Sequence, residues 1–101
     1  MASFNGQVAL VTGAGRGLGL AYARCLGILG ATVLIQDVGA DAEGRGADPD
    51  IAERAAATLR SERLDARALA GALDTRDACR ALVSDALAHR DRLDALIHNA
   101  G

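Results

Sequence analysis

The sequence predicts an α/β fold built on a doubly wound parallel sheet. Short apolar runs alternate with helical patterns, each run is apolar throughout rather than at every second residue, and a glycine cluster follows the first run. Continuous hydrophobicity is typical of strands that are covered on both faces. With 101 residues, the chain is expected to form a single domain, residues 1–101.

The first strand and the first helix are separated by glycines. The apolar run at 7–12 is expected to form the strand. A helix is expected from Gly17, because apolar residues recur there at helical spacing, and Gly30 stands where a glycine often ends a helix. The expected buried face of this helix consists of Leu18, Tyr22, Cys25, Leu26 and Leu29.

The middle of the chain contains a second strand and a second helix around a loop. Residues 32–37 form the second expected strand, and the glycine-rich stretch 38–47 lacks periodicity and is expected to be a loop. Asp48 and Pro49 suit the cap and the first position of a helix. The buried side of that helix is expected to include Ile51, Ala55 and Leu59.

The last part of the chain repeats the alternation. Residues 66–73 and 93–98 are the third and fourth expected strands, and Asp74 or Thr75 can cap the helix between them. The apolar residues of that helix are Ala78, Leu82, Ala86 and Leu87. This order calls for right-handed crossovers. We therefore expect an incomplete Rossmann-like sheet of four strands in the order 3-2-1-4, with helices on both faces.

Composition excludes several classes of function. All 11 basic residues are Arg, and Tyr22 is the single tyrosine. The absence of Lys excludes a P-loop of the GxxxxGK[ST] type, a Schiff-base enzyme and a Tyr-Lys catalytic pair within these residues. A net charge of −2 favours neither nucleic acid nor an anionic membrane as a partner. No apolar run is long enough for a transmembrane helix.

The cysteines and the N-terminus predict a reduced, cytoplasmic protein. Cys25 and Cys79 have no metal-ligand spacing, so both are expected to be small buried hydrophobic residues. The first six residues contain no basic region followed by an apolar one, as a signal peptide would.

The glycine cluster between the first strand and the first helix is a candidate pyrophosphate site. Glycines let backbone N–H groups approach a ligand, and a helix N-terminus adds the positive end of its dipole. The cluster does not match GxGxxG but does match TGxxxGxG, starting at Thr12. The alternative is a plain tight turn. The cofactor-binding candidates here are Gly13, Arg16, Gly17, Leu18 and Gly19.

Asp37 is the candidate that selects the cofactor. It ends the second strand, 24 residues after Gly13, where a carboxylate accepts hydrogen bonds from the ribose hydroxyls of adenosine. The same carboxylate repels a 2′-phosphate. Although Arg16 could bind such a phosphate, Val38 is apolar where a further basic residue would help. We therefore expect NAD rather than NADP, the alternative being a solvated acid.

Three further positions follow the third and fourth strands. Asp74 can accept a hydrogen bond from the adenine amino group or cap a helix, and Thr75 is counted with it as a cofactor-binding candidate. Asn99 lies in a small-residue turn that could pass under the cofactor or be an ordinary turn. His98 is expected to face the sheet or its edge, without a catalytic role.

Together these residues resemble the short-chain dehydrogenase/reductase family. The likeness covers the whole chain and rests on the glycine turn, Asp37, Asp74 and the terminal His98-Asn99-Ala100-Gly101. The last motif matches the Asn-Asn-Ala-Gly of that family except at His98, which leaves a specific hydrogen bond at this position unassigned. The loop after Asp37 is similar to that of members related to hydroxyacyl-CoA and steroid dehydrogenases.

The resemblance implies reversible hydride transfer between a nicotinamide cofactor and an alcohol or ketone. In this family a Tyr, a Lys and a Ser carry out catalysis, and all three lie beyond the Asn-Ala-Gly motif. Tyr22 cannot replace the catalytic Tyr, since we expect it on the core face and Leu26 stands four residues later. No catalytic residue is assigned, and a full-length form is expected to be a homo-oligomer.

Three hypotheses are compatible with this pattern. The first is the cofactor-binding N-terminal part of a short-chain dehydrogenase, inactive by itself, with an apolar sheet edge left exposed at the fourth strand. The second is a complete, non-catalytic module that binds an adenine nucleotide. The third is a methyltransferase, which usually has an acid before the first glycine, where Thr12 stands here.

Overall fold

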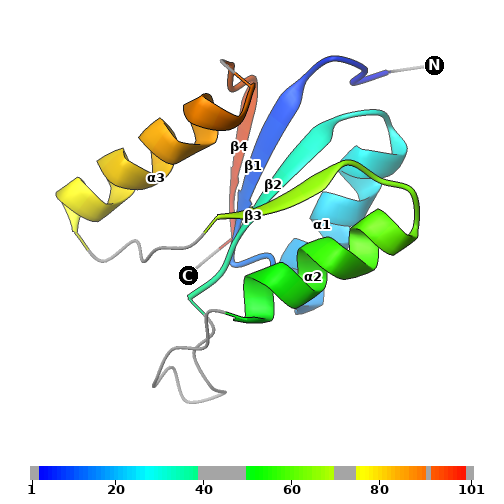
Figure 1. Cartoon of the computed structure of the whole chain (residues 1–101), viewed down its shortest axis with the longest axis horizontal. Coiled ribbons are helices and arrows are strands. Elements are labelled where there is room, and N and C mark those ends of the chain that lie inside the picture. Colours follow the sequence, from blue (N-terminus) through cyan, green and yellow to red (C-terminus); the bar gives the residue numbers. More distant parts are fainter. Residues whose placement is uncertain (1–2, 39–49, 70–74, 91, 100–101) are drawn as a thin grey trace.

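The computed structural model describes residues 3–38, 50–69, 75–90 and 92–99. Strands and helices alternate strictly along these residues (Figure 1). The elements are β1 Val8–Thr12, α1 Gly17–Ile28, β2 Thr32–Gln36, α2 Asp50–Ser61, β3 Ala66–Leu69, α3 Arg76–Arg90 and β4 Ala95–His98. The order expected from the sequence is therefore confirmed.

The four strands form one parallel sheet in the order β3-β2-β1-β4. Its register places Thr12 of β1 beside Gln36 of β2 on one side and His98 of β4 on the other. Helices α1 and α2 cover one face of the sheet, and α3 lies on the opposite face (Figure 1). The expected strand order 3-2-1-4 and the covering of both faces are confirmed.

Each face of the sheet carries its own core. Alternate residues of β1 and β2 point to opposite faces, which is why both strands are apolar at almost every position. Toward α1 and α2, the buried core includes Val11, Val33, Ile35, Ala23, Ala56 and Leu59. Toward α3, it consists of Val8, Leu10, Leu34, Leu69, Leu82 and Ala86.

The buried face of α1 differs from the one expected. Gly19, Ala23 and Gly27 are its buried residues, whereas Tyr22 is 41% exposed and Leu18 is 61% exposed. Small residues at every fourth position let the helix pack closely: a Cβ on Gly27 would lie 3.2 Å from the Cδ1 of Leu64, which lies between α2 and β3. The prediction was wrong for Leu18, Tyr22 and Cys25 because it followed the large apolar residues, whereas Leu26 does pack against the core.

The cysteines also differ from expectation, since Cys25 is exposed and Cys79 is half-buried. Cys25 lies on the same side of α1 as the exposed Tyr22, and both border a hollow of about 490 Å³ between α1 and β4. Among the other apolar residues named for the helices, Ile51 and Ala78 are half-buried and Leu87 is exposed.

The helix boundaries agree with the sequence where they are described. Gly30 has a φ of 107° and directly follows Leu29, the C-cap of α1, as expected of a terminating glycine. Thr75 caps α3, because its Oγ1 accepts the N–H of Ala78 at 3.0 Å. The predictions for 38–47 beyond Val38, for Asp48 and Pro49 and for Asp74 lie outside the described residues.

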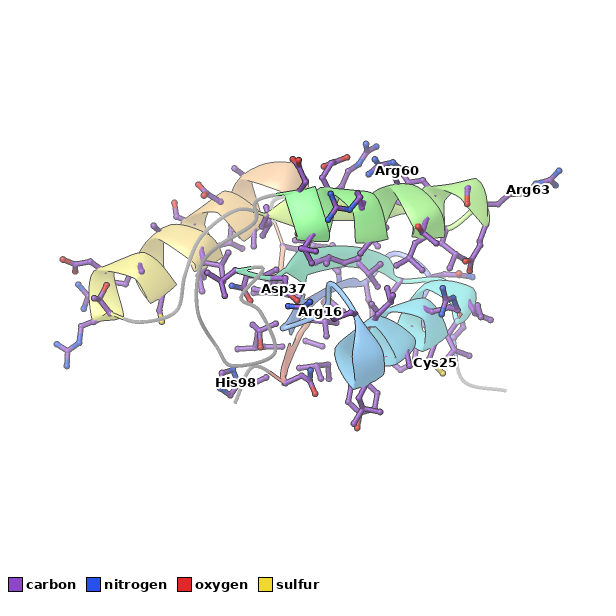
Figure 2. All side chains as sticks on the ribbon, turned by 90° about the horizontal axis from the view of Figure 1, so that it is seen from below. Arg16, Cys25, Asp37, Arg60, Arg63 and His98 are labelled. Carbon is purple, nitrogen blue, oxygen red and sulfur yellow. The ribbon has the colours of Figure 1, made fainter. Side chains whose placement is uncertain are left out.

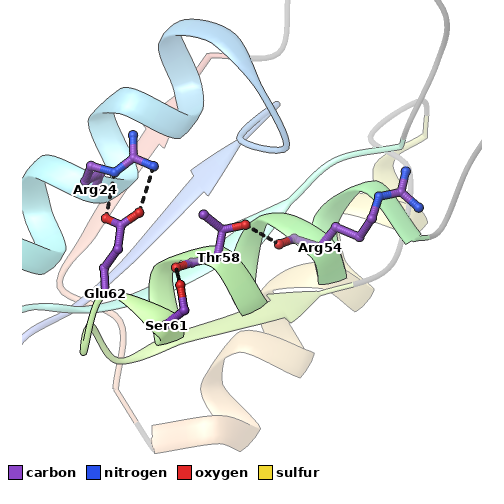
Figure 3. Close-up of polar contacts among 5 residues, drawn as sticks. All are labelled: Arg24, Arg54, Thr58, Ser61 and Glu62. Atoms are coloured by element: carbon purple, nitrogen blue, oxygen red, sulfur yellow. Dashed lines mark hydrogen bonds and ion pairs between the residues drawn. The ribbon is translucent and has the colours of Figure 1, made fainter.

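A surface ion pair joins the two helices on one face. Arg24 of α1 contacts Glu62 just after α2, with Nε to Oε1 at 2.9 Å and Nη2 to Oε2 at 3.2 Å (Figure 3). The hydrogen bond between Arg24 and Glu62 raises the pKa of Arg24 and lowers the pKa of Glu62.

Within the described residues, no helix has the length and hydrophobicity needed to cross a membrane.

Candidate functional site

The candidate site lies at the carboxyl ends of β1, β2 and β4. Arg16, Asp37 and His98, which follow or end these strands, lie toward one end of the molecule, and Arg63 lies at the other (Figure 2). The strand order reverses between β1 and β4, since the chain builds outward from β1 to β3 and then returns to the other side of β1. In open α/β sheets, ligands bind at such a reversal point.

The glycine turn between β1 and α1 requires glycine for two separate reasons. Gly13 and Gly17 have φ values of 61° and 62°, in the left-handed region that other residues rarely adopt. Gly15 and Gly19 instead have no room for a side chain. A Cβ on Gly15 would lie 2.7 Å from Asp37 Oδ2, and one on Gly19 would lie 2.7 Å from the side-chain nitrogen of Asn99.

Strand β2 holds the first half of the turn through three consecutive N–H groups. Gly13 N–H donates to Gln36 Oε1 at 3.2 Å, Ala14 N–H to Gln36 O at 2.9 Å and Gly15 N–H to Asp37 Oδ2 at 2.8 Å. All three donors are therefore already occupied by protein acceptors. This part of the turn acts as a support, and its N–H groups are not the ones offered to a ligand.

The end of β4 holds the same turn from the other side. Thr12 Oγ1 accepts the N–H of Asn99 at 3.0 Å, and Asn99 Nδ2 donates to the carbonyl of Gly13 at 3.2 Å. His98 Nδ1 lies 3.2 Å from Thr12 Oγ1. Asn99 thus fastens β4 to the turn by its backbone and its side chain.

The second half of the turn is the part that can bind an anion. Helix α1 begins at Gly17, its Arg16 N-cap makes no capping hydrogen bond, and its first turn has no acidic residue. A helix supplies no acceptor to its own first N–H groups, here those of Gly17, Leu18 and Gly19. These donors, the positive end of the helix dipole and the exposed Arg16 favour a phosphate group.

Most of the predicted residues are brought together at this end of the sheet: Gly13, Arg16, Gly17, Leu18, Gly19, Asp37 and Asn99. Thr75 is described only as the cap of α3, and Asp74 lies outside the described residues. The sequence analysis missed Gln36. Its one signal is an amide residue at the last position of an otherwise apolar strand, directly before Asp37.

Hollows flank β4 on both faces of the sheet. One of about 490 Å³ lies beside α1, lined in part by Tyr22 and Ile97, and one of about 350 Å³ lies beside α3, lined in part by Leu82 and Leu96. Leu96 is 55% exposed. Among the described strands, β4 therefore has an exposed apolar side chain, Leu96, and borders a hollow on each face. Among the described residues, no group of acids, histidines and cysteines could hold a metal ion.

Comparisons with known proteins agree with this geometry. The sequence pattern of a family described as short chain dehydrogenase matches residues 7–101. The chain is 41% identical over 98 residues to the mouse peroxisomal multifunctional enzyme type 2, covering 97% of this chain and 13% of that protein. The alignment therefore leaves most of the mouse protein uncovered.

Two solved structures are similar over almost the whole chain. A hydroxysteroid dehydrogenase from Escherichia coli has a TM-score of 0.85 and 25% identity, covering 99% of this chain and 39% of its own. The Pseudomonas aeruginosa RhlG structure, an active-site complex with NADP, has a TM-score of 0.81 and 33% identity, covering 99% and 36%. The chain thus spans less than two-fifths of each structure.

Proposed function

The chain belongs to the short-chain dehydrogenase family, and from this premise we propose that it binds NAD as the cofactor-binding portion of an oxidoreductase. The observation that carries the proposal is the division of the glycine turn. One half is fixed to β2 and β4, and the other presents N–H groups at the start of α1. Asp37, one residue beyond β2, stands next to that turn.

The residues present fit a dinucleotide. The N–H groups of Gly17, Leu18 and Gly19 would hold the pyrophosphate, with Arg16 adding positive charge. The Asp37 carboxylate accepts a hydrogen bond from Gly15 through Oδ2, and a carboxylate has about four acceptor positions in all. Those positions suit the ribose hydroxyls. When bound, the nicotinamide ring supplies the hydride chemistry.

Asp37 favours NAD over NADP. A 2′-phosphate carries about −1.5 to −2 charges near neutral pH and would lie where the ribose hydroxyls meet this carboxylate. The NADP in the RhlG complex belongs to that protein, which is 33% identical to this chain. Here the N–H of Gly15 donates to Asp37 Oδ2 at 2.8 Å, so the carboxylate is held at the turn. This position supports the choice of NAD.

The catalytic groups are proposed to lie outside these residues. A Tyr-Lys pair is impossible here because the chain has no Lys. Although Tyr22 is more exposed than expected, Leu26 still occupies the place four residues later. The apolar hollows on both faces of β4 suit contacts with further polypeptide. The substrate class proposed for a full-length, homo-oligomeric form is an alcohol or ketone.

Calorimetric titration of the 101-residue chain with NAD, NADP and AMP tests the cofactor. We expect NAD to bind more tightly than NADP, and the Asp37→Ala variant to lose most of that preference. Asp85→Ala, at an exposed acid on α3, is the matched control and should bind both as the wild type does. Tighter binding of NADP by the wild type would contradict the choice of NAD.

A second measurement tests the absence of catalysis. Incubation of the chain with NAD and a panel of secondary alcohols should produce no NADH. Turnover of any of these alcohols would show that the catalytic groups lie within these 101 residues. Equal, weak binding of NAD and AMP would instead favour the alternative, a non-catalytic module that recognises adenosine alone.

The proposed location is the cytoplasm, because Cys25 and Cys79 are both thiols and thiols stay reduced in that compartment. The name of the mouse relative places that protein in the peroxisome. Fluorescence microscopy of the tagged full-length protein decides between the two locations.

A further inference from the structure

Gln36 occupies an unusual position for a polar side chain. Among the residues whose burial is described, Thr12 and Gln36 are the two buried polar ones, each 2% exposed. They are direct neighbours in the parallel register of β1 and β2, at the last residue of each strand. Burying an amide is costly unless it is hydrogen-bonded, so its contacts indicate why an amide stands at this position.

Two acceptor atoms of Gln36 contact the start of the glycine turn. Its side-chain Oε1 accepts the N–H of Gly13 at 3.2 Å, and its backbone carbonyl accepts the N–H of Ala14 at 2.9 Å. On the other side, Asn99 Nδ2 donates to the carbonyl of Gly13 at 3.2 Å. The N–H of Gly13 is therefore held by a side chain of β2, and its carbonyl is held by the side chain that directly follows β4. We refer to Gln36, Gly13 and Asn99 as the Gly13 clamp.

The clamp acts where the backbone changes direction. Gly13 has a φ of 61°, and a residue without a side chain has little conformational preference of its own at such a value. External hydrogen bonds must therefore select this conformation. The direction of the chain after Gly13 sets where Gly17, Leu18 and Gly19 direct their N–H groups.

We propose that Gln36 is a positioning residue for the cofactor pyrophosphate, which it orients by fixing the peptide of Gly13. The proposal rests on the proposed NAD site and adds a residue that would not touch the cofactor. Loss of the Gln36 oxygen leaves the adenosine contact at Asp37 in place but lets the turn deviate at its first residue. Pyrophosphate binding should then weaken more than adenosine binding.

The variants Gln36→Met and Gln36→Glu distinguish the effect of losing the Oε1 acceptor from the effect of changing the side chain in general. Methionine keeps the length but removes the acceptor oxygen and the amide nitrogen, whereas glutamate keeps an oxygen at the same place and has a second oxygen instead of the nitrogen. Gln7→Met, at the other end of β1, is the matched control. We expect Q36M to weaken NAD binding about tenfold, as the loss of one such hydrogen bond implies, and to change adenosine binding less than twofold. Q7M should leave both affinities unchanged.

Amide hydrogen exchange tests the clamp without any ligand. In the wild type, the N–H of Gly13 should exchange much more slowly than that of Gly17, an exposed residue at the start of α1. Q36M should remove the protection of Gly13, and Q36E should retain it. This measurement separates the two proposals. A wild-type chain that fails to bind NAD would contradict the proposed NAD site, whereas the exchange data would still show whether Gln36 holds Gly13.

Three results would overturn the positioning role. The first is wild-type Gly13 exchanging as fast as Gly17. The second is equal NAD affinity in Q36M and the wild type. The third is an equal loss of adenosine and NAD binding in Q36M, which would indicate a general structural role. If Q36M does not fold, the wild-type comparison of Gly13 with Gly17 and the protection of Gly13 in Q36E still decide the question.

Discussion

Asp94 and Val8 exchange two hydrogen bonds across the amino ends of β4 and β1. The N–H of Val8 donates to Asp94 Oδ2 at 2.7 Å, and the N–H of Asp94 donates to the carbonyl of Val8 at 2.8 Å. Arg92 contacts the same carboxylate through Nη2 to Oδ1 at 2.6 Å. This end of the edge strand is therefore fastened to the sheet by a charged side chain, just as the other end is fastened by Asn99.

The Asp94 contact predicts a loss of stability in acid. Hydrogen bonds from Arg92 and then from Val8 hold the pKa of the Asp94 carboxyl below its ordinary value of 3.8. A lowered pKa in the folded state stabilises the protein above the ordinary value, and this contribution disappears as the pH falls through the folded-state pKa. We expect Asp94→Asn to lower the Tm at pH 7, with a difference from the wild type that shrinks below pH 3.8.

Thermal melts of the wild type, D94N and Arg92→Met between pH 2 and pH 7 test this. R92M removes the largest cause of the shift but leaves the Val8 contact, so its pH dependence should lie between those of the other two. A wild type and D94N that differ by the same amount at every pH would contradict the assignment.

Substitutions in the glycine turn should differ in severity according to the space around each glycine. A Cβ on Gly17 would meet nothing within 4 Å, so Gly17→Ala should cost only the strain of a positive φ, about 1–2 kcal/mol. A Cβ on Gly19 would meet the carbonyl oxygen of Gly13 and the side chain of Asn99. We expect Gly19→Ala to cost about 3 kcal/mol or more and to abolish NAD binding.

Urea unfolding gives the two free energies, and calorimetry gives the two affinities. Because both variants replace Gly by Ala within one turn, each is the control for the other. Equal losses of stability in G17A and G19A would contradict the close approach of Gly19 to the turn.

The contact between Thr12 and His98 predicts which nitrogen of the ring carries hydrogen. Thr12 Oγ1 already accepts the N–H of Asn99, and its own hydrogen can be donated either to His98 Nδ1 at 3.2 Å or to the carbonyl of Ile97 at 3.5 Å, the longer of the two contacts. Neutral His98 should therefore carry its hydrogen on Nε2. In Thr12→Val this preference should weaken, and the free energy of unfolding should fall by about 1 kcal/mol because the N–H of Asn99 loses its acceptor.

Nitrogen NMR of the imidazole distinguishes the two tautomers. Thr12→Ser keeps the hydroxyl and should retain the wild-type nitrogen shifts. A wild-type spectrum with hydrogen mainly on Nδ1 would show that Thr12 does not donate to His98.

The exposed apolar surface at β4 should cause the chain to self-associate. Leu96 is 55% exposed and lines the hollow beside α3, next to Leu82 and Val83. We expect Leu96→Lys to lower the fraction of associated protein, as measured by sedimentation velocity. Ile28→Lys, at a residue 67% exposed at the end of α1, is the control and should have a smaller effect. A wild type that is monomeric at all concentrations would contradict this expectation.

The sequence predicted the order of elements and the strand order because a parallel sheet covered on both faces leaves a clear pattern. Each run was apolar at nearly every position, as β1 and β2 are in the structure. The same reasoning failed for α1. Periodicity favours large residues such as Leu18 and Tyr22, whereas close packing against the sheet needed Gly19 and Ala23.

For the candidate site, the residues that directly follow strands were predictable. The glycine turn, Asp37 and Asn99 each come after an apolar run, and the ends of parallel strands meet at one edge. Gln36 was not predictable in this way. Its partner Gly13 is 23 residues away, and the contact depends on the register of β2 against β1.

By itself, the sequence determined the fold class, the position of the glycine turn and, through the absence of Lys, that no Tyr-Lys pair lies in these residues. Only the tertiary structure decided which N–H groups of the turn are occupied and which remain for a ligand. The reason is physical: hydrogen bonds to Gly13 and Gly15 come from β2 and β4, and strand register alone brings those acceptors and donors within reach.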